Sequence, residues 1–169
     1  MKSSTFILLL LFAFNLAKAQ KNDAEKCRYT KTPNGFLMVL REGDNVLEMI
    51  ENLAKEQKIP SANFTGIGFA QQATFGFYDF NEKKFHPKTF NKVEMGSLTG
   101  SIAWSGEKPS IHLHGVATDD KFDAYGGHIL ELKVGTGSME IYVTVNPEKL
   151  ERKIEQPLNA NVLQLPCIK

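Results

Sequence analysis

The spacing of apolar residues near the start of the chain predicts one amphipathic helix. From Val46 to residue 54, apolar side chains recur every three or four positions, with Glu, Asn and Lys between them. Asp44 is a suitable N-cap for this helix, which we expect to end near Lys58, just before Pro60. A preceding apolar run, Phe36 to Leu40, predicts a buried strand.

The chain after Pro60 is typical of strands. β-branched and aromatic residues dominate seven segments, and Gly, Asn, Asp and Pro separate them. The tail, residues 147–169, is polar with short apolar patches, and we expect a short helical turn followed by an extended end. The pattern predicts a single α+β domain, a mostly antiparallel or mixed sheet with one main helix packed on it. The seven segments are FTGIGFA, ATFGFYDF, KKFHPKTF, KVEMGSLTGSIAW, SIHLHGVAT, HILELKV and SMEIYVTV.

The first 19 residues have the features of a secretory signal peptide. Lys2 precedes a short apolar run, and Ala17-Lys18-Ala19 supplies the small residues of a cleavage site. The run is too short for a membrane span. We therefore expect a periplasmic or secreted protein cleaved after Ala19. The expected segments are a signal peptide (1–19), a polar lead (20–34), the folded domain (35–146) and a C-terminal tail (147–169).

The charge balance bears on the partners of the protein. The chain has 20 basic and 19 acidic residues, and cleavage after Ala19 removes Lys2 and Lys18. The remaining chain has no basic surplus, which argues against nucleic acid as a partner. Two cysteines, Cys27 and Cys167, could form a disulfide in an oxidising compartment, or they could remain two unrelated thiols.

Three histidines suggest a metal site. His112 and His114 alternate with apolar residues, so both side chains should project from one face of a strand. The loop TDDKFDAYGG then returns the chain to His128, which can lie beside this pair if the two strands are neighbours. Three imidazoles suit Zn²⁺ or another divalent transition metal and leave a coordination position open. The alternative is ordinary histidines on a strand face, which is our interpretation of His86.

The order of motifs resembles the plants-and-prokaryotes-conserved (PPC) domain. The segments that carry the resemblance are IPSANFTGIGFAQQATFGFYD, GSLTGSIAW, SIHLHGVATD and YGGHILELKVG. The resemblance implies a homotrimer and, in prokaryotic members, a metal held by His112, His114 and His128. It also implies a fold like that of acetolactate decarboxylase, a zinc enzyme. Plant members carry AT-hook DNA-binding motifs, but this sequence has no R-G-R-P hook.

Five other residues are candidates for a ligand pocket. Arg41 could bind an anionic ligand or a carboxylate such as Glu94. Tyr125, Gly126 and Gly127 occupy the expected edge of a pocket, although the demands of a turn also explain the glycines. A structural ion pair, or an exposed arginine, is the simpler interpretation of Arg41.

Three functions are consistent with these features. The first is an exported metal-binding protein with lyase or hydrolase activity on a small molecule. The second is a non-catalytic trimeric module that binds a small ligand. The third is DNA binding, suggested by the family and opposed by charge and export.

Overall fold

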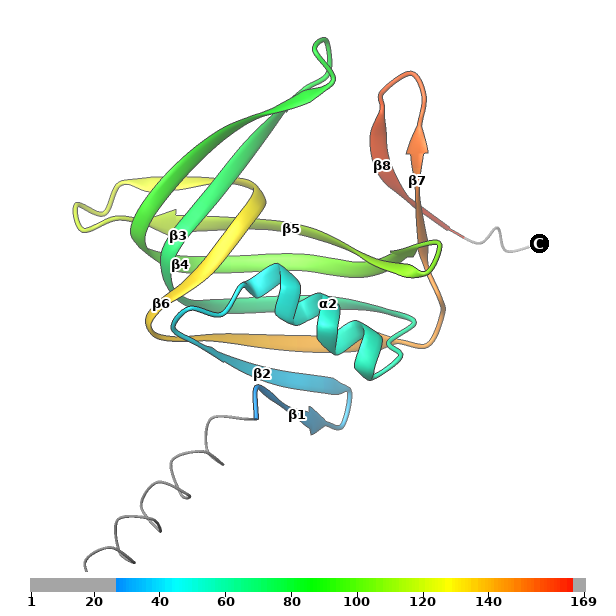
Figure 1. Ribbon diagram of the computed structural model, residues 1–169, viewed down its shortest axis with the longest axis horizontal. Helices are drawn as coiled ribbons and strands as arrows, with labels where there is room; N and C mark the ends of the chain where they lie inside the picture. The colour runs from blue at the N-terminus through cyan, green and yellow to red at the C-terminus, as the bar shows by residue number, and fades with distance from the viewer. Residues whose placement is uncertain (1–26, 166–169) are drawn as a thin grey trace, which may run out of the picture.

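The computed structural model describes residues 27–165, in which a curved sheet carries one helix on one of its faces (Figure 1). The mixed sheet and the single described helix confirm the predicted fold class. The predicted signal peptide lies outside the described residues. The elements are β1 (Tyr29–Thr32), β2 (Gly35–Arg41), α2 (Val46–Glu56), β3 (Ser61–Asp79), β4 (Lys84–Ser105), β5 (Lys108–Thr118), β6 (Ala124–Asn146), β7 (Glu151–Glu155) and β8 (Ala160–Gln164).

Four strands pair in a closed ring. β3 pairs with β4, β4 with β5, β5 with β6, and β6 again with β3, all antiparallel. β2 and then β1 extend the sheet beyond β6. Because β6 pairs with β5 near its start and with β2 near its end, this single strand connects the ring to the edge of the sheet.

The sequence pattern predicted two shorter strands in place of each of β3, β4 and β6, and this prediction was wrong. The predicted breaks at Gln71-Gln72 and at residues 135–137 lie at register irregularities inside the continuous strands β3 and β6. The register shifts between Gly66 and Gly68 on β3, where Gly68 has φ of +152°, and between Met95 and Ser97 on β4. A bulge adds a residue and bends the strand without ending it, which a sequence pattern does not distinguish from a turn.

The helix begins one residue later than predicted. Asn45, not Asp44, is the N-cap, and its side chain accepts a hydrogen bond from the backbone N–H of Glu48. Asp44 instead accepts from Arg28 Nε at 2.7 Å and from the backbone N–H of Arg41 at 2.8 Å. Both residue types cap helices well, so these tertiary partners of Asp44 decide the position.

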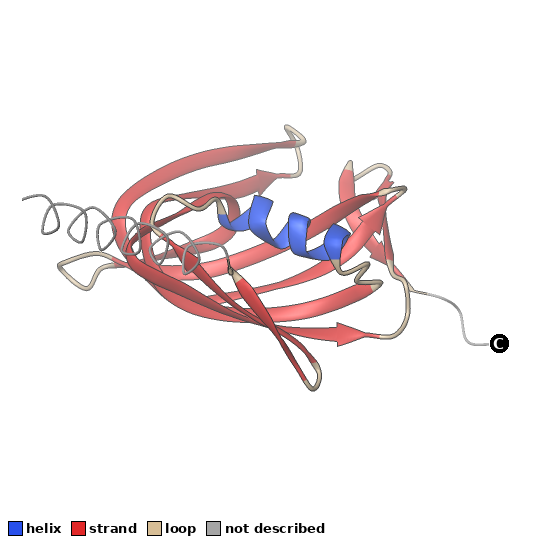
Figure 2. Ribbon diagram, turned by 60° about the horizontal axis from the view of Figure 1, so that its bottom comes forward, coloured by secondary structure: helices blue, strands red, loops and turns tan. Residues whose placement is uncertain are grey.

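The hydrophobic core lies between α2 and the sheet, and α2 packs against β5 and β6. Figure 2 shows the helix lying across the curved strands. Ile50 and Leu53 of the helix are buried, as are alternate residues of the strands, including Met38, Leu40 and Leu113. Their neighbours in sequence point to the opposite, open face of the sheet.

The tail forms a β-hairpin, so the predicted helical turn was wrong. β7 and β8 pair antiparallel, and β7 meets β4 in parallel at Trp104 and Glu151. The Trp104 backbone N–H also donates to the Leu150 carbonyl at 2.9 Å. The Glu, Lys and Arg residues of this segment favour a helix in isolation, but pairing with β4 holds the backbone extended.

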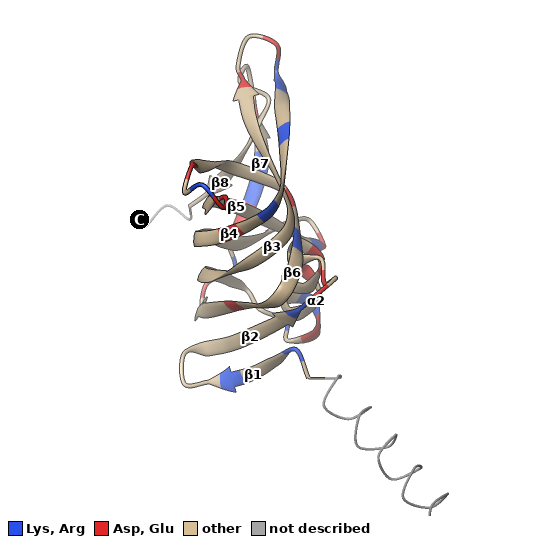
Figure 3. Cartoon of the chain, turned by 90° about the vertical axis from the view of Figure 1, so that its left-hand side faces the viewer, with Lys and Arg blue, Asp and Glu red and all other residues tan. Residues whose placement is uncertain are grey.

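The described surface mixes charges of both signs. Figure 3 shows lysine and arginine interspersed with aspartate and glutamate along the strands and around α2. Within residues 27–165, no helix has the length and apolar character needed to span a bilayer.

Candidate metal centre

His112 and His114 project from the open face of β5. Leu113 between them is 1% exposed and packs in the core, whereas both histidines are exposed. The alternation of side chains along a strand therefore places the two imidazoles together, as predicted.

His128 reaches the same place from β6, where it lies directly opposite His114. Two glycines permit this approach. A Cβ atom on Gly126 would lie 2.8 Å from the carbonyl oxygen of Gly115, and Gly127 has φ of +148°. A side chain at either position would conflict with the backbone that the pairing requires.

The three histidines form a group able to hold one metal ion. Each offers a ring nitrogen, and these nitrogens lie within 4.8 Å of one another. The ring centroids are 5.1 to 5.2 Å apart. None of the three rings makes a hydrogen bond to another described residue. Three imidazole nitrogens that face one another in this way suit a divalent transition metal.

Two of the histidines are held in the neutral form that a metal requires. Burial lowers the pKa of His128 to about 4, with smaller contributions from His112 and His114. Burial also lowers the pKa of His112, and the positive charges of Arg152 and His114 lower it further. Near neutral pH, His112 and His128 therefore each have one ring nitrogen with a lone pair available to a metal.

A hollow of about 480 Å³ adjoins His112 and His114 on the open face. The residues that line it are polar, apart from one glycine, and most have short side chains. In the sheet, Ser101 lies opposite both His112 and Asn63, and Thr99 lies opposite His114. The hollow is lined by Asn63, Thr99, Gly100, Ser101, His112 and His114.

Aromatic packing covers the other side of the centre. Phe85 of β4 stacks on His128, with ring centroids 4.8 Å apart and planes 21° from parallel. This contact shields the imidazole from water and contributes to the burial that lowers the pKa of His128.

The remaining predicted pocket residues lie apart from the three histidines. Arg41 is the last residue of β2. Glu94 lies on β4, opposite Thr118 of β5. β6 and β3 separate these two strands, and no ion pair joins Arg41 to Glu94 among the described residues. Tyr125 stacks on Phe90 and donates a hydrogen bond to Asp119 at 2.9 Å, so it stabilises the loop before β6.

The predicted disulfide remains a prediction. Cys27 is exposed, and its Sγ donates to the carbonyl oxygen of Tyr29 at 3.1 Å. Cys167 lies outside the described residues.

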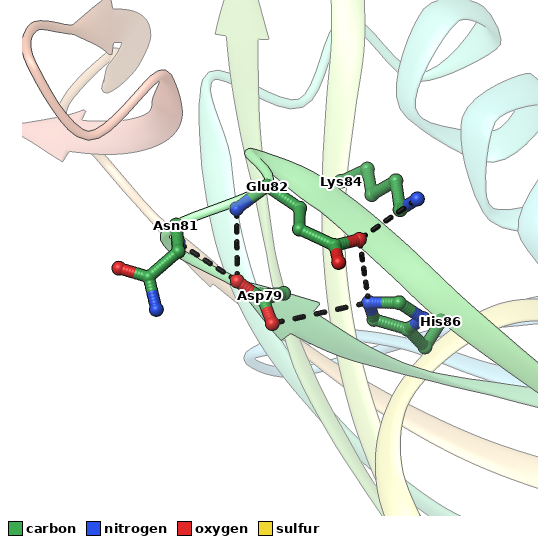
Figure 4. Close-up of polar contacts among 5 residues, drawn as sticks. All are labelled: Asp79, Asn81, Glu82, Lys84 and His86. Carbon is green, nitrogen blue, oxygen red and sulfur yellow. Dashed lines mark hydrogen bonds and ion pairs between the residues drawn. The ribbon is translucent and has the colours of Figure 1, made fainter.

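A second group with potential metal ligands occupies the turn between β3 and β4 (Figure 4). His86 Nε2 lies 3.3 Å from Glu82 and 3.9 Å from Asp79. Asp79 already accepts from the backbone N–H groups of Asn81 and Glu82, and Glu82 pairs with Lys84 at 2.7 Å. These contacts stabilise the turn and account for the group without a metal.

The sequence did not identify Ser101, Asn63 or Arg152 as part of the site. Arg152 of β7 is 5% exposed and donates to Ser101 Oγ at 2.6 Å. Serine and asparagine are common on exposed strand faces, and Arg152 comes from a tail 40 residues after His112. The only signal in the sequence is alternation within β3 and β4, which places Asn63 and Ser101 on the solvent-facing side.

Comparison with solved structures shows the same fold in several proteins. A protein from Ralstonia eutropha JMP134, whose description proposes DNA binding, is 60% identical and superposes with a TM-score of 0.81, covering 83% of this chain and 98% of its own. A metal-containing protein from Archaeoglobus fulgidus is 27% identical, with a TM-score of 0.71 over 83% of this chain and 99% of its own.

A more distant match has the same fold only. Acetolactate decarboxylase from Bacillus subtilis is 10% identical, with a TM-score of 0.51 over 69% of this chain and 54% of its own. A comparison with curated proteins finds no match. The family model described as the Plants and Prokaryotes Conserved (PCC) domain matches residues 27–147, which include all three histidines of the centre. The chain therefore belongs to the PCC domain family, the family whose motifs the sequence resembles.

Proposed function

We propose that the protein binds a divalent transition metal, with zinc the best fit, through His112, His114 and His128. The observation that carries this proposal is the convergence of three ring nitrogens within 4.8 Å on one face of the sheet. The metal-containing relative from Archaeoglobus fulgidus supports it, because that chain is similar over nearly its whole length.

The donor set favours a site for a small molecule over a purely structural one. Structural zinc sites close with four protein ligands, whereas three histidines leave a position for a ligand. The polar hollow beside His112 and His114 provides space for such a ligand. A metal at this site would act as a Lewis acid on a bound carbonyl, which fits lyase or hydrolase chemistry.

Export and trimer formation are also part of the proposal. Export rests on the signal-like residues 1–19. Trimer formation rests on the family resemblance and is supported by Ile67 and Tyr142, which are 58% and 55% exposed on the open face of the sheet. Apolar side chains of this size are often covered by a second copy of the chain. Light scattering coupled to size-exclusion chromatography measures the oligomeric state.

The second candidate is DNA binding, which the description of the Ralstonia eutropha relative favours. Duplex DNA would be held by lysine and arginine contacts to phosphate, so its affinity would fall steeply with salt. Fluorescence anisotropy with labelled duplex at two salt concentrations tests this candidate directly.

Elemental analysis tests the metal proposal. The protein lacking residues 1–19, purified without chelator or added metal and then exposed to zinc, should retain about one ion per chain. The variant His112→Ala/His114→Ala/His128→Ala should retain none. His86→Ala is the matched control, because it removes the one histidine outside the centre. Equal metal content in the wild type and the triple variant would overturn the proposal.

An activity screen separates the catalytic role from simple binding. Turnover of carbonyl or ester substrates that disappears with chelator and in the triple variant supports an enzyme. A protein that retains its metal and binds small ligands without converting them is instead the non-catalytic module.

A further inference from the structure

Arg152 has an unusual environment for a charged side chain. It is 5% exposed, and its Nε is buried without a hydrogen-bond partner. Nη2 donates to Ser101 Oγ at 2.6 Å. Among residues 27–165, no carboxylate lies within ion-pair distance of the guanidinium. Within the described part of the chain, Arg152 is therefore a buried positive charge whose guanidinium has a neutral hydroxyl as its one hydrogen-bond partner.

A buried guanidinium without an ion-pair partner is expected to bind an anion. Burial of an ion without a partner of opposite charge is costly, and buried arginines are usually paired with carboxylate or phosphate. Burial lowers the pKa of Arg152, yet a guanidinium remains protonated in proteins. The missing negative charge must then come from outside the described chain.

Ser101 connects this charge to the candidate metal centre. Ser101 lies directly opposite His112, so their Cβ atoms are about 4.5–5.5 Å apart. Its hydroxyl oxygen accepts the hydrogen bond from Arg152, which leaves its own hydrogen free to donate into the hollow. Asn63, opposite Ser101 on β3, adds an amide to the same hollow.

We propose that Ser101 and Arg152 form an anion subsite beside the three histidines and that the ligand of the centre is a small carboxylic acid. In this arrangement, the carboxylate lies at Ser101 and a second oxygen of the ligand lies at the histidines. The inference rests on the proposed function for that second oxygen, whereas the anion subsite itself does not require a metal.

The charge and size of the hollow favour a carboxylate. None of the residues that line it is a lysine, an arginine or a carboxylate, and Arg152, which lies outside the lining, places its positive charge behind Ser101 through their hydrogen bond. A single positive charge matches a monoanion, whereas a phosphate ester carries about −1.5 to −2 near neutral pH. Ser101 and His112 are separated by one strand spacing, about 4.8 Å, which fits an acid of a few carbons.

Glycolate, which combines a carboxylate with a neighbouring hydroxyl, is the probe, and ethylene glycol is its neutral counterpart. The first measurement uses metal-free protein, with glycolate titrated while the amide signals of β4 and β5 are followed by NMR. We expect glycolate to shift the Ser101 signal in the wild type and ethylene glycol to leave it unchanged.

The variants isolate the contribution of the charge. Arg152→Met removes the charge behind Ser101 and should weaken glycolate binding by about threefold to tenfold, because the guanidinium acts on the carboxylate through the Ser101 hydroxyl. Ser101→Ala, which keeps the charge and removes the donor, should weaken binding by about tenfold to a hundredfold, the value of a hydrogen bond to a charged group. Lys153→Met is the matched control, because it removes the same charge from the adjacent exposed residue and should leave the affinity unchanged.

A second measurement uses cobalt-loaded protein, in which the visible absorption of the metal reports a ligand oxygen at the histidines. Glycolate should change this spectrum in the wild type at a lower concentration than in Arg152→Met. Inorganic phosphate should bind more weakly than glycolate; tighter binding of phosphate would overturn the assignment to a carboxylic acid.

The outcomes separate the subsite from the metal. Glycolate binding that depends on Arg152 in a protein unable to hold cobalt supports the subsite and refutes the metal function. Equal glycolate affinity in the wild type, Arg152→Met and Ser101→Ala overturns the subsite whether or not the metal binds. Loss of the native oligomer in Arg152→Met, with unchanged glycolate affinity in Ser101→Ala, would assign Arg152 to an ion pair with a second copy and also overturn the inference.

Discussion

Gly126→Ala tests whether close backbone contact between β5 and β6 positions His128. A Cβ atom there would lie 2.8 Å from the carbonyl oxygen of Gly115 and 3.2 Å from Cγ2 of Val116. The first partner is backbone and cannot rotate away. Restoring an ordinary contact of about 3.4 Å requires the strands to separate by about 0.6 Å.

This displacement should affect both stability and metal binding. Overpacking of this kind costs about 1–3 kcal/mol in the free energy of unfolding. His128 is two residues from the substitution, and metal–ligand distances tolerate about 0.2 Å. We therefore expect zinc affinity to fall by about tenfold to a hundredfold, as for other changes that misplace a ligand without removing it.

Urea denaturation of metal-free protein measures the first effect, and competition with a zinc chelator measures the second. Gly96→Ala is the matched control, because its new Cβ atom would meet nothing closer than the Val116 carbonyl oxygen at 4.0 Å. It should leave zinc affinity unchanged. Wild-type stability and zinc affinity in Gly126→Ala would refute the reasoning.

Three further predictions concern the same centre and the core beneath it. In metal-free protein, NMR should show His128 titrating near pH 4 and His112 below 6.5, since burial lowers both pKa values. As the pH falls, the unfolded chain takes up these protons before the folded protein does. The free energy of unfolding should therefore be greatest above pH 6.5 and decrease towards pH 4, by about 1–2 kcal/mol for the partly exposed His128. Urea denaturation at each pH measures this decrease. Phe85→Ala should raise the pKa of His128 towards 6.5 in the same titration, and an unchanged value would show that the stacked ring does not shield it. Leu113→Ala should lower the free energy of unfolding by about 2–5 kcal/mol, because its side chain is 1% exposed, and a loss below 1 kcal/mol would contradict the burial of Leu113.

The helix and the histidine group could be predicted because each depends on local periodicity. Helical spacing identified α2 to within two residues of its end, and alternation placed His112 and His114 on one face of β5. The Gly-Gly pair before His128 indicated a return into a neighbouring strand, and the pairing of His128 with His114 confirms this.

The rest of the site depends on contacts that leave no periodic signal. Ser101 becomes significant only because β4 pairs with β5 opposite His112, and that register is set by tertiary packing. Arg152 was not identified because its segment has a helical composition, and only the pairing of β7 with β4 makes it extended. The polar pair Gln71-Gln72 similarly suggested a break where β3 continues.

The metal ligands and the positive charge proposed to bind an anion come from different parts of the chain. The three histidines lie within residues 27–147, whereas Arg152 enters from the hairpin that follows this family domain. The charge beside the centre could therefore be changed by altering a short terminal appendage, with the metal ligands and the ring of strands left intact. Exchange of the β7–β8 hairpin is thus a route to new ligand selectivity on a constant metal-binding framework.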